Sequence, residues 1–153
     1  MMRILLFCLL IATPVWATVE TFSTPTSTTW TAPAGVTSVR VECWGGGGAG
    51  ARSTTNTTGR GGGGGGGYAI RTAMAVTPGN NYSYTVGAGG TDGASPVNGA
   101  DSTFTGNSSV QCIGKGAASV ADNTTNGTAG GTGSTGDTTH DGGAGAAGSG
   151  SNS

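Results

Sequence analysis

The one histidine of the chain, His140, lies close to two aspartates and is the first place to look for chemistry. Asp137 and Asp141 stand on either side of it, and carboxylates orient an imidazole in general-base catalysis. A hydrolytic triad also needs a nucleophile in a defined turn, and the chain has no Gly-x-Ser-x-Gly motif. A zinc site needs three or four ligands, which one imidazole does not supply. We therefore interpret His140 as an exposed polar residue of a repeat loop.

Two motifs that bind ions or phosphates begin in this chain and then break. Residues 130–134 start a calcium-binding nonapeptide repeat, but Thr135 occupies the position of the aspartate ligand. A phosphate-binding loop requires Gly-Lys-Ser/Thr, whereas Lys115 is followed by glycine. The sequence therefore predicts no catalytic residue, no cofactor and no metal site, and the protein is not expected to be an enzyme. Calcium binding through Asp92 or Asp137 is the alternative that this pattern leaves open.

The chain opens with the three parts of a secretory signal peptide. Arg3 supplies the positive charge, residues 4–11 are an unbroken apolar run, and Val15 and Ala17 are small residues at the cleavage positions. An uncleaved membrane anchor is the alternative, although the run is short for a spanning helix. We expect a mature protein that begins near Thr18, has no membrane span, and is secreted or held at the cell surface.

Cleavage leaves two cysteines in the mature chain, Cys43 and Cys112. In an oxidising compartment, two cysteines in a small domain are typical of one disulfide. Two separate buried thiols are the alternative, and the sequence does not decide between them.

Glycine dominates the mature chain, where it makes up about a quarter of the residues against about 7% in ordinary proteins. All 33 glycines follow residue 17, and the whole chain has only five prolines, which excludes collagen. Five Lys and Arg against seven Asp and Glu give the mature chain a net charge of −2. No basic patch favours nucleic acid or an anionic membrane as a partner.

Alternating apolar residues predict strands and no helix. The clearest alternation is at 38–44, where Val39, Val41 and Cys43 share one face. Shorter patterns predict further strands at 29–31, 68–76, 82–86, 102–105 and 108–113. Residues 77–79, Thr-Pro-Gly, predict a turn in which glycine takes a positive φ. We expect an all-β, small β-sandwich-like domain with long Gly-rich loops and no helix apart from the signal peptide.

Glycine recurs at every third residue in two regions of the chain. Between Gly127 and Gly148 only Thr139 interrupts this spacing, and the same period runs between Gly87 and Gly99 with Pro96 in place of one glycine. Three residues per turn is the period of polyproline II. A bare edge of glycines would let such helices approach until their backbones pair, as polyglycine II. Low-complexity disorder is the alternative, because flexible linkers have the same composition.

The patterns divide the chain into a signal peptide, a Gly-rich β domain and a Gly-X-X repeat tail, at residues 1–17, 18–120 and 121–153. The sequence does not decide whether the tail is ordered or disordered. The seven glycines at 61–67 lie between two predicted strands, so we expect them to be packed rather than slack. Ordering them costs on the order of 1 kcal/mol or more per glycine, which close packing must offset. Replacing Gly63 or Gly65 with valine is therefore expected to destabilise the domain.

Aromatic residues on the predicted strands raise the question of a platform on which sugars stack. These residues are Trp30, Trp44, Tyr68, Tyr82 and Tyr84. Because each lies on a predicted strand, packing in the core or against a sheet face is the favoured interpretation.

The order of several motifs between residues 28 and 116 resembles a known domain. The motifs are TTWTAPAGVTSVRVECWGGGGAG, GGGGGGGYA, VTPGNNYSYTVGAGG and GADSTF. They resemble the glycine-rich domain of secreted bacterial surface proteins and of phage tail-fibre and adhesin proteins. The resemblance implies a β-sandwich-like base with long Gly-rich loops. In some phage adhesins such loops pack as a layer of polyglycine II helices with host recognition at their tips.

The expected function is therefore that of an exported, non-enzymatic surface or adhesive module. Its partner would be a cell-surface glycan or protein, or sibling chains. The glycines assigned to candidate recognition loops are Gly61, Gly64, Gly67, Gly90, Gly93, Gly130 and Gly133. The alternative function is a structural fibre or matrix subunit whose Gly-X-X segments pack between chains. A phage tail-fibre adhesin and an ice-binding protein are more remote alternatives.

Overall fold

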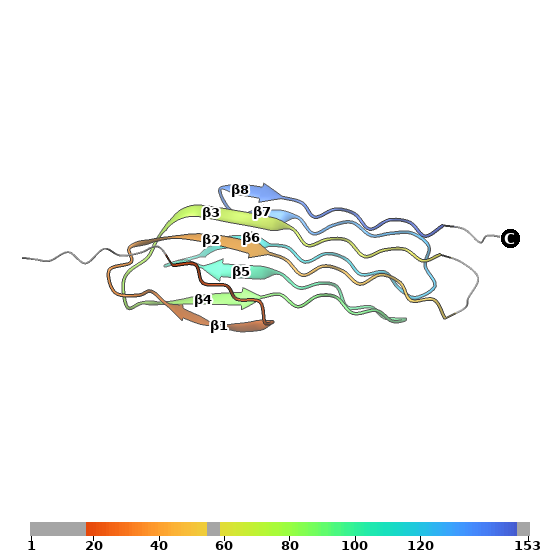
Figure 1. Ribbon diagram of the computed structural model, residues 1–153, viewed down its shortest axis with the longest axis horizontal. Coiled ribbons are helices and arrows are strands. Elements are labelled where there is room, and N and C mark those ends of the chain that lie inside the picture. The colour runs from red at the N-terminus through yellow and green to blue at the C-terminus, as the bar shows by residue number, and fades with distance from the viewer. Residues whose placement is uncertain (1–17, 55–58, 150–153) are drawn as a thin grey trace, which may run out of the picture.

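The computed structural model describes residues 18–54 and 59–149, so the predicted signal peptide lies outside the described residues. Within these ranges the chain forms eight strands and no helix. The strands are β1 (Thr26–Thr31), β2 (Ser38–Trp44), β3 (Tyr68–Ala75), β4 (Asn81–Val86), β5 (Ser102–Thr105), β6 (Val110–Gly114), β7 (Gly133–Thr135) and β8 (Thr138–His140). They gather at one end of an elongated molecule, and Gly-rich segments run from them to the other end (Figure 1).

The strands form two antiparallel sheets. One sheet has the order β1-β4-β5-β6-β7 and the other has the order β2-β3-β8. Side chains from both sheets meet in one buried cluster, which includes Cys43 of β2, Met74 of β3, Tyr82 of β4, Phe104 of β5 and Cys112 of β6. The prediction of an all-β, β-sandwich-like domain is therefore confirmed.

The predicted strands agree with the structure where apolar residues alternate. β2 and β5 coincide with the predicted ranges, and the other four predicted strands differ from β1, β3, β4 and β6 by a few residues. The turn after β3 is also confirmed. Asn80 N donates to Thr77 O at 3.1 Å, and Gly79 has a φ of 82°, which a side chain would disfavour.

Two strands lie in the segment that the sequence assigned to a repeat tail. β7 pairs with β6, and β8 pairs with β3, so residues 121–149 pack in the same domain as the strands before them. No boundary falls at residue 120. The sequences of these strands, GST and TTH, have no apolar alternation, and it is the pairing with long neighbouring strands that orders them.

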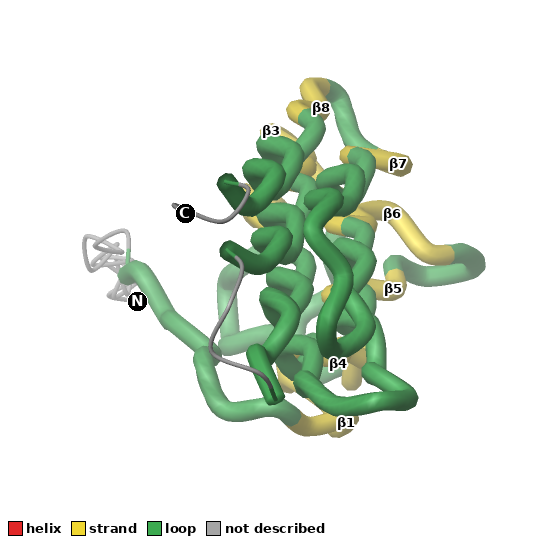
Figure 2. The backbone as a smooth tube through the Cα atoms, turned by 90° about the vertical axis from the view of Figure 1, so that its right-hand side faces the viewer, coloured by secondary structure: helices red, strands yellow, loops and turns green. Residues whose placement is uncertain are grey.

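Each sheet continues into a layer of Gly-rich segments. We call the continuation of β2, β3 and β8 the three-segment layer, with residues 45–51, 59–67 and 141–149. The continuation of β4, β5, β6 and β7 is the four-segment layer, with residues 87–91, 97–101, 115–121 and 124–132. Figure 2 looks along these segments and shows them as parallel coils stacked in two columns.

Backbone hydrogen bonds between the segments repeat at every third residue. In one such series, Gly59, Gly62 and Gly65 donate from N to the carbonyl oxygens of Ser149, Ala146 and Gly143 at 2.8–3.0 Å. In another, Gly142, Gly145 and Gly148 donate to Gly131, Thr128 and Thr125 at 2.7–2.8 Å. A three-residue repeat is the period of the polyproline II conformation. The Gly-rich segments therefore pack as a bundle of polyglycine II helices.

Candidate functional site at the end of the bundle

The seven-glycine run forms the middle helix of the three-segment layer. A Cβ added at Gly61, Gly64 or Gly67 would overlap backbone atoms of segment 124–132. A Cβ at Gly63 or Gly66 would overlap the backbone of segment 45–51. At Gly62 and Gly65 the added atom would lie 3.3 and 3.4 Å from backbone nitrogens of segment 141–149. Two edges of this helix therefore face other backbones too closely for a side chain, whereas the third edge, at Gly62 and Gly65, is closer to ordinary contact.

Two chain reversals that the structure describes lie at the end of the bundle, near residues 121–124 and 92–96, beside residues 52–54, which follow segment 45–51. Asp122 connects these three parts. Its Oδ1 accepts from Arg52 N at 3.1 Å, its Oδ2 lies 3.5 Å from Arg52 Nη2, and its backbone N donates to Gly93 O at 3.1 Å. The Asp122 side chain is only 6% exposed, whereas the side chain of Arg52 is 65% exposed and covers it from the solvent side of the pair.

Asn123 completes the connection. Its Oδ1 accepts from Thr54 N at 3.2 Å, Thr54 Oγ1 at 2.9 Å and Arg60 Nη2 at 3.1 Å, and its own N donates to Arg52 O at 3.1 Å. Asn123 has a φ of 62°, a left-handed conformation that asparagine tolerates better than most residues. We call Asp122 and Asn123 together the tip clasp.

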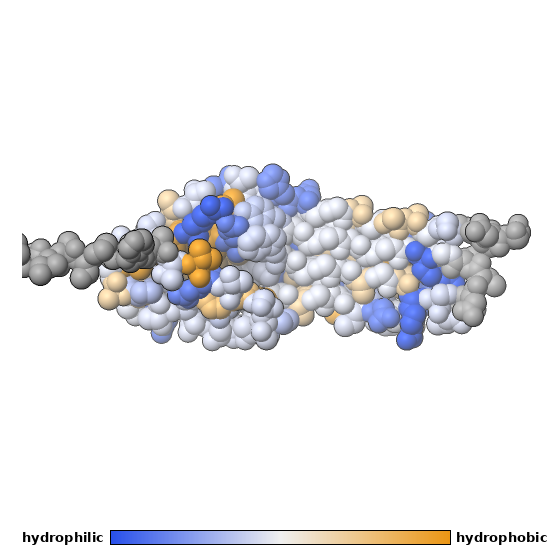
Figure 3. Space-filling model, in the orientation of Figure 1, coloured by the Kyte–Doolittle hydropathy of each residue, from blue (hydrophilic) through white to orange (hydrophobic). Residues whose placement is uncertain are grey.

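A buried serine holds the second reversal against the bundle. Ser119 Oγ donates to Val97 O at 2.7 Å and accepts from Ala49 N at 2.9 Å, while Ser119 N donates to Asn98 Oδ1 at 3.0 Å. Thr91 and Val97 also form a two-way backbone pair. The reversals are therefore fixed by hydrogen bonds, and Figure 3 shows hydrophilic residues (blue) near this end of the bundle.

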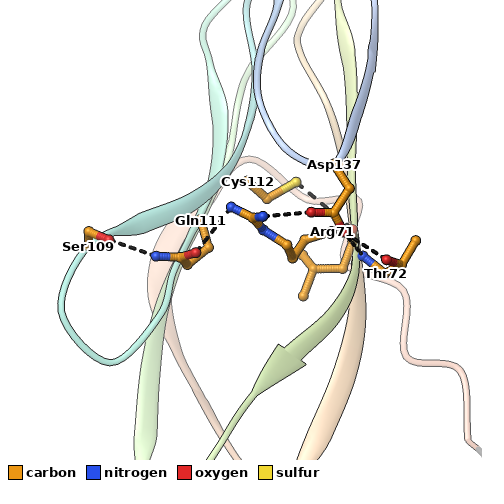
Figure 4. Close-up of polar contacts among 7 residues, drawn as sticks. Arg71, Thr72, Ser109, Gln111, Cys112 and Asp137 are labelled. Atoms are coloured by element: carbon orange, nitrogen blue, oxygen red, sulfur yellow. Dashed lines mark hydrogen bonds and ion pairs between the residues drawn. The ribbon is translucent and has the colours of Figure 1, made fainter.

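A second polar cluster lies at the sheets and joins β3, β6 and the β7–β8 turn (Figure 4). Asp137 Oδ1 accepts from Arg71 Nη1 at 2.6 Å, and its Oδ2 accepts from Thr72 N and Thr72 Oγ1 at 2.7 Å each. Arg71 Nη2 also donates to Gln111 Oε1 at 3.2 Å. The hydrogen bonds from Thr72 and from Arg71 lower the pKa of Asp137 to about 2. The cluster borders a cavity of about 280 Å³ lined by Arg71, Met74, Asn107 and Gln111, among others.

The five aromatic residues singled out from the sequence divide into two groups. Tyr82 is buried in the core, where Trp30 and Tyr84 pack against it. Trp44 and Tyr68 instead lie on the outer face of the three-stranded sheet with their ring centroids 5.2 Å apart. Three of the five residues, Trp30, Tyr82 and Tyr84, therefore pack in or against the core.

Cys43 and Cys112 are both buried between the sheets, and both are free thiols in the structure. They contact each other, and Cys112 Sγ also donates to Ala69 O at 3.4 Å. The hydrogen bond with Cys112, together with burial, raises the pKa of the Cys43 thiol. Their contact fits either of the two alternatives, and the disulfide stays a prediction.

Comparison with known families agrees with this architecture. A family model described as a glycine-rich domain matches residues 22–153, which is nearly the whole chain. The chain belongs to the glycine-rich domain family. A search of curated proteins found no match.

Within this glycine-rich domain, the glycines assigned to recognition loops have different positions. Gly61, Gly64 and Gly67 are buried inside the bundle. A Cβ at Gly130 would overlap segment 141–149, and one at Gly133 would overlap β3. Gly90 packs against Ser119 and Val97, and only Gly93, with a φ of 136°, lies at a chain reversal.

Sequence reasoning missed the tip clasp of the domain. An Asp-Asn pair between two repetitive segments is a turn signal, because both side chains bond to nearby backbone and tolerate left-handed conformations. The sequence contains that signal at 122–123, but nothing in it specifies that Arg52, Thr54 and Arg60 converge there. The His140 prediction is correct in exposure, although the residue lies on β8 rather than in a loop.

Among residues 18–54 and 59–149, no three side chains of the types His, Cys, Asp and Glu gather as a metal site would require. The same residues contain no helix with the length and apolar character needed to cross a bilayer.

Proposed function

We propose that this glycine-rich domain is an exported, non-enzymatic surface or adhesive module that contacts its partner with the far end of the bundle. The observation that carries the proposal is the tip clasp, Asp122 and Asn123, which ties the two described reversals and residues 52–54 into one end surface. Ordered loops lose little conformational entropy on binding, which favours recognition there over recognition by slack loops.

The geometry of the domain supports contact at this end. The described chain begins at the sheets (red in Figure 1), and the reversals lie at the opposite end of the long axis. A module that is held at its beginning would therefore present the reversals farthest from the point of attachment. Export rests on the predicted signal peptide.

In this proposal the glycines and the loops have separate tasks. The buried glycines allow the helices to approach, and the reversals between the helices make the contact. Exposed residues of the second reversal include Ala94, Ser95 and Val97, the last of which is 63% exposed. Short polar groups, exposed backbone and one apolar side chain suit a cell-surface glycan or protein better than a small molecule that needs a concave pocket.

Adding a large side chain at the tip tests the proposal. The protein would be assayed on intact cells and on an array of cell-surface glycans and proteins. In Ala94→Trp the indole covers the second reversal, and we expect binding to fall at least tenfold. Ala144→Trp is the matched control, because Ala144 is also exposed but lies midway along segment 141–149. Equal binding by both variants, or no binding by the unmodified protein, would contradict recognition at the tip.

The alternative function, a fibre or matrix subunit, is favoured by one observation. Segment 141–149 bonds to two other segments, and a Cβ added at Gly143 would meet no atom within 4 Å. A sibling chain could therefore approach the backbone there. Sedimentation over a range of concentrations tests this alternative, which a persistent monomer would exclude.

A further inference from the structure

Three aromatic rings form a row across the outer face of the three-stranded sheet. Trp44, Tyr68 and His140 are directly paired on β2, β3 and β8. The centroids of Trp44 and Tyr68 are 5.2 Å apart, and those of Tyr68 and His140 are 5.9 Å apart with nearly parallel rings. Trp44 is 61% exposed, although tryptophan is usually well buried. We call these three residues the aromatic row.

Polar groups surround the row. Tyr68 Oη donates to Glu42 Oε2 at 3.1 Å, and Glu42 Oε1 pairs with Arg40 Nη2 at 2.5 Å. Partial burial and the hydrogen bond to Glu42 raise the pKa of Tyr68, so its hydroxyl stays protonated at neutral pH. Among the residues that the structure describes, no group accepts a hydrogen bond from Trp44 Nε1 or from the His140 ring. These groups are available to a ligand.

Beyond the row, the surface of the bundle has glycine, and therefore no side chain, at three exposed positions. The strands of the row continue into the three-segment layer, where Gly47, Gly65 and Gly143 are exposed. A Cβ at these glycines would meet its nearest atom at 3.6 Å, at 3.4 Å and beyond 4 Å respectively, so their outward sides are comparatively open. An extended ligand that stacks on the rings could thus continue along the bundle without meeting side chains at these positions.

We propose that the aromatic row binds a neutral saccharide chain. The apolar face of a sugar ring packs on an aromatic ring, and the hydroxyls around its edge bond to amphipathic side chains such as Tyr and Trp. Because Arg40 and Glu42 neutralise each other, the row offers no net charge to an anionic or cationic ligand. Proline-rich peptides are recognised in aromatic-lined grooves, whereas this surface is a sheet face. The site is separate from the bundle tip and does not depend on recognition there.

The test uses the purified chain with cellohexaose, chitohexaose and maltohexaose as probes. Binding would be measured by calorimetry and by quenching of tryptophan fluorescence. We expect at least one hexasaccharide to bind, and Trp44→Ala to weaken its affinity about tenfold or more. Loss of an aromatic residue that stacks on a nucleic-acid base has an effect of this order. Phe22→Ala is the matched control, because Phe22 is a partly exposed aromatic that contacts Tyr84 and lies outside the row.

A second variant and a second measurement keep the proposal testable if Trp44→Ala does not fold normally. If Trp44→Ala lowers the melting temperature, then His140→Ala, on the short strand β8, serves instead. Failure of all three hexasaccharides to bind, or equal binding by the row variants, would overturn the proposal. So would sedimentation showing that the row holds a second copy of the chain. Ala94→Trp should leave saccharide binding unchanged, so failure at the row and failure at the tip are distinguishable.

Discussion

At the scale of single residues, seven consecutive glycines have three different environments. The sequence identifies the run as packed, because it lies between two predicted strands, but it gives each glycine the same weight. In the structure, Gly63 faces the backbone of Gly48, whereas an atom added at Gly65 would reach Gly143 N only at 3.4 Å. The two positions are therefore not equivalent, although the sequence-based expectation treated them alike.

We predict that Gly63→Ala lowers the free energy of unfolding by about 1–3 kcal/mol or more, because its methyl group would overlap a carbonyl that cannot move freely. Gly65→Ala should change the free energy of unfolding by less than about 1 kcal/mol. The close contact of the new methyl group with Gly143 N destabilises the folded state slightly, and alanine lowers the conformational entropy of the unfolded chain, which has the opposite effect. Urea unfolding of both variants measures the difference. Equal losses at the two positions would contradict the assignment of the helix edges.

At the scale of elements, alternation was sufficient to find the strands with a buried apolar face. β2 was predicted with its correct bounds because Val39, Val41 and Cys43 pack toward the core while Trp44 faces outward. β7 and β8 could not be predicted, because their residues are small or polar and their order comes from pairing with β6 and β3. Hydrogen bonds that the Asp137 carboxylate accepts from Arg71 and Thr72 then hold the turn between them.

This turn should make the domain sensitive to acid. Hydrogen bonds hold the pKa of Asp137 at about 2, below the ordinary value of 3.8, so the unfolded chain binds more protons between these values. The contribution of Asp137 is therefore complete above about pH 4 and is lost as the pH falls toward 2. We predict that Asp137→Asn flattens the fall in stability over this window, measured by unfolding at each pH.

Asp101 provides the comparison for that experiment. Burial opposes its ionisation, but hydrogen bonds from Lys115 and from Gly116 N prevail and lower its pKa. Asp101→Asn should therefore flatten part of the same fall, but without releasing the β7–β8 turn. If Asp137→Asn and the unmodified protein lose stability identically between pH 4 and pH 2, the turn is not the acid-sensitive element.

At the scale of the whole molecule, two sheets and two helical layers form one continuous body. The period of three in the sequence left polyglycine II helices and disorder as alternatives, and the three-residue repeat of backbone hydrogen bonds in the described segments agrees with the first. The neighbours of each helix could not be predicted, since segments such as 124–132 and 141–149 share the three-residue glycine spacing and have no alternation that would select a partner. The aromatic row could not be predicted either. Its residues were visible in the sequence, but their placement on one face depends on the order β2-β3-β8.

The three-residue register of the bundle leads to a prediction about insertions. In segment 141–149, only Gly142, Gly145 and Gly148 face the middle helix, and a Cβ at any of them would overlap its backbone. One alanine inserted after Gly143 would turn Ala144 and Ala147 toward that helix. We predict a loss of roughly 2–6 kcal/mol in the free energy of unfolding, from two overlaps of about 1–3 kcal/mol each.

Insertion of Ala-Gly-Ala at the same point is the matched control. Three residues complete one turn, so glycine again occupies every position that faces the middle helix, and the stability should stay within about 1 kcal/mol of the original. The longer insertion is thus expected to be the milder one, which is the reverse of what a slack tail would give. If both insertions are tolerated equally in a thermal melt, segment 141–149 is not held in a three-residue register.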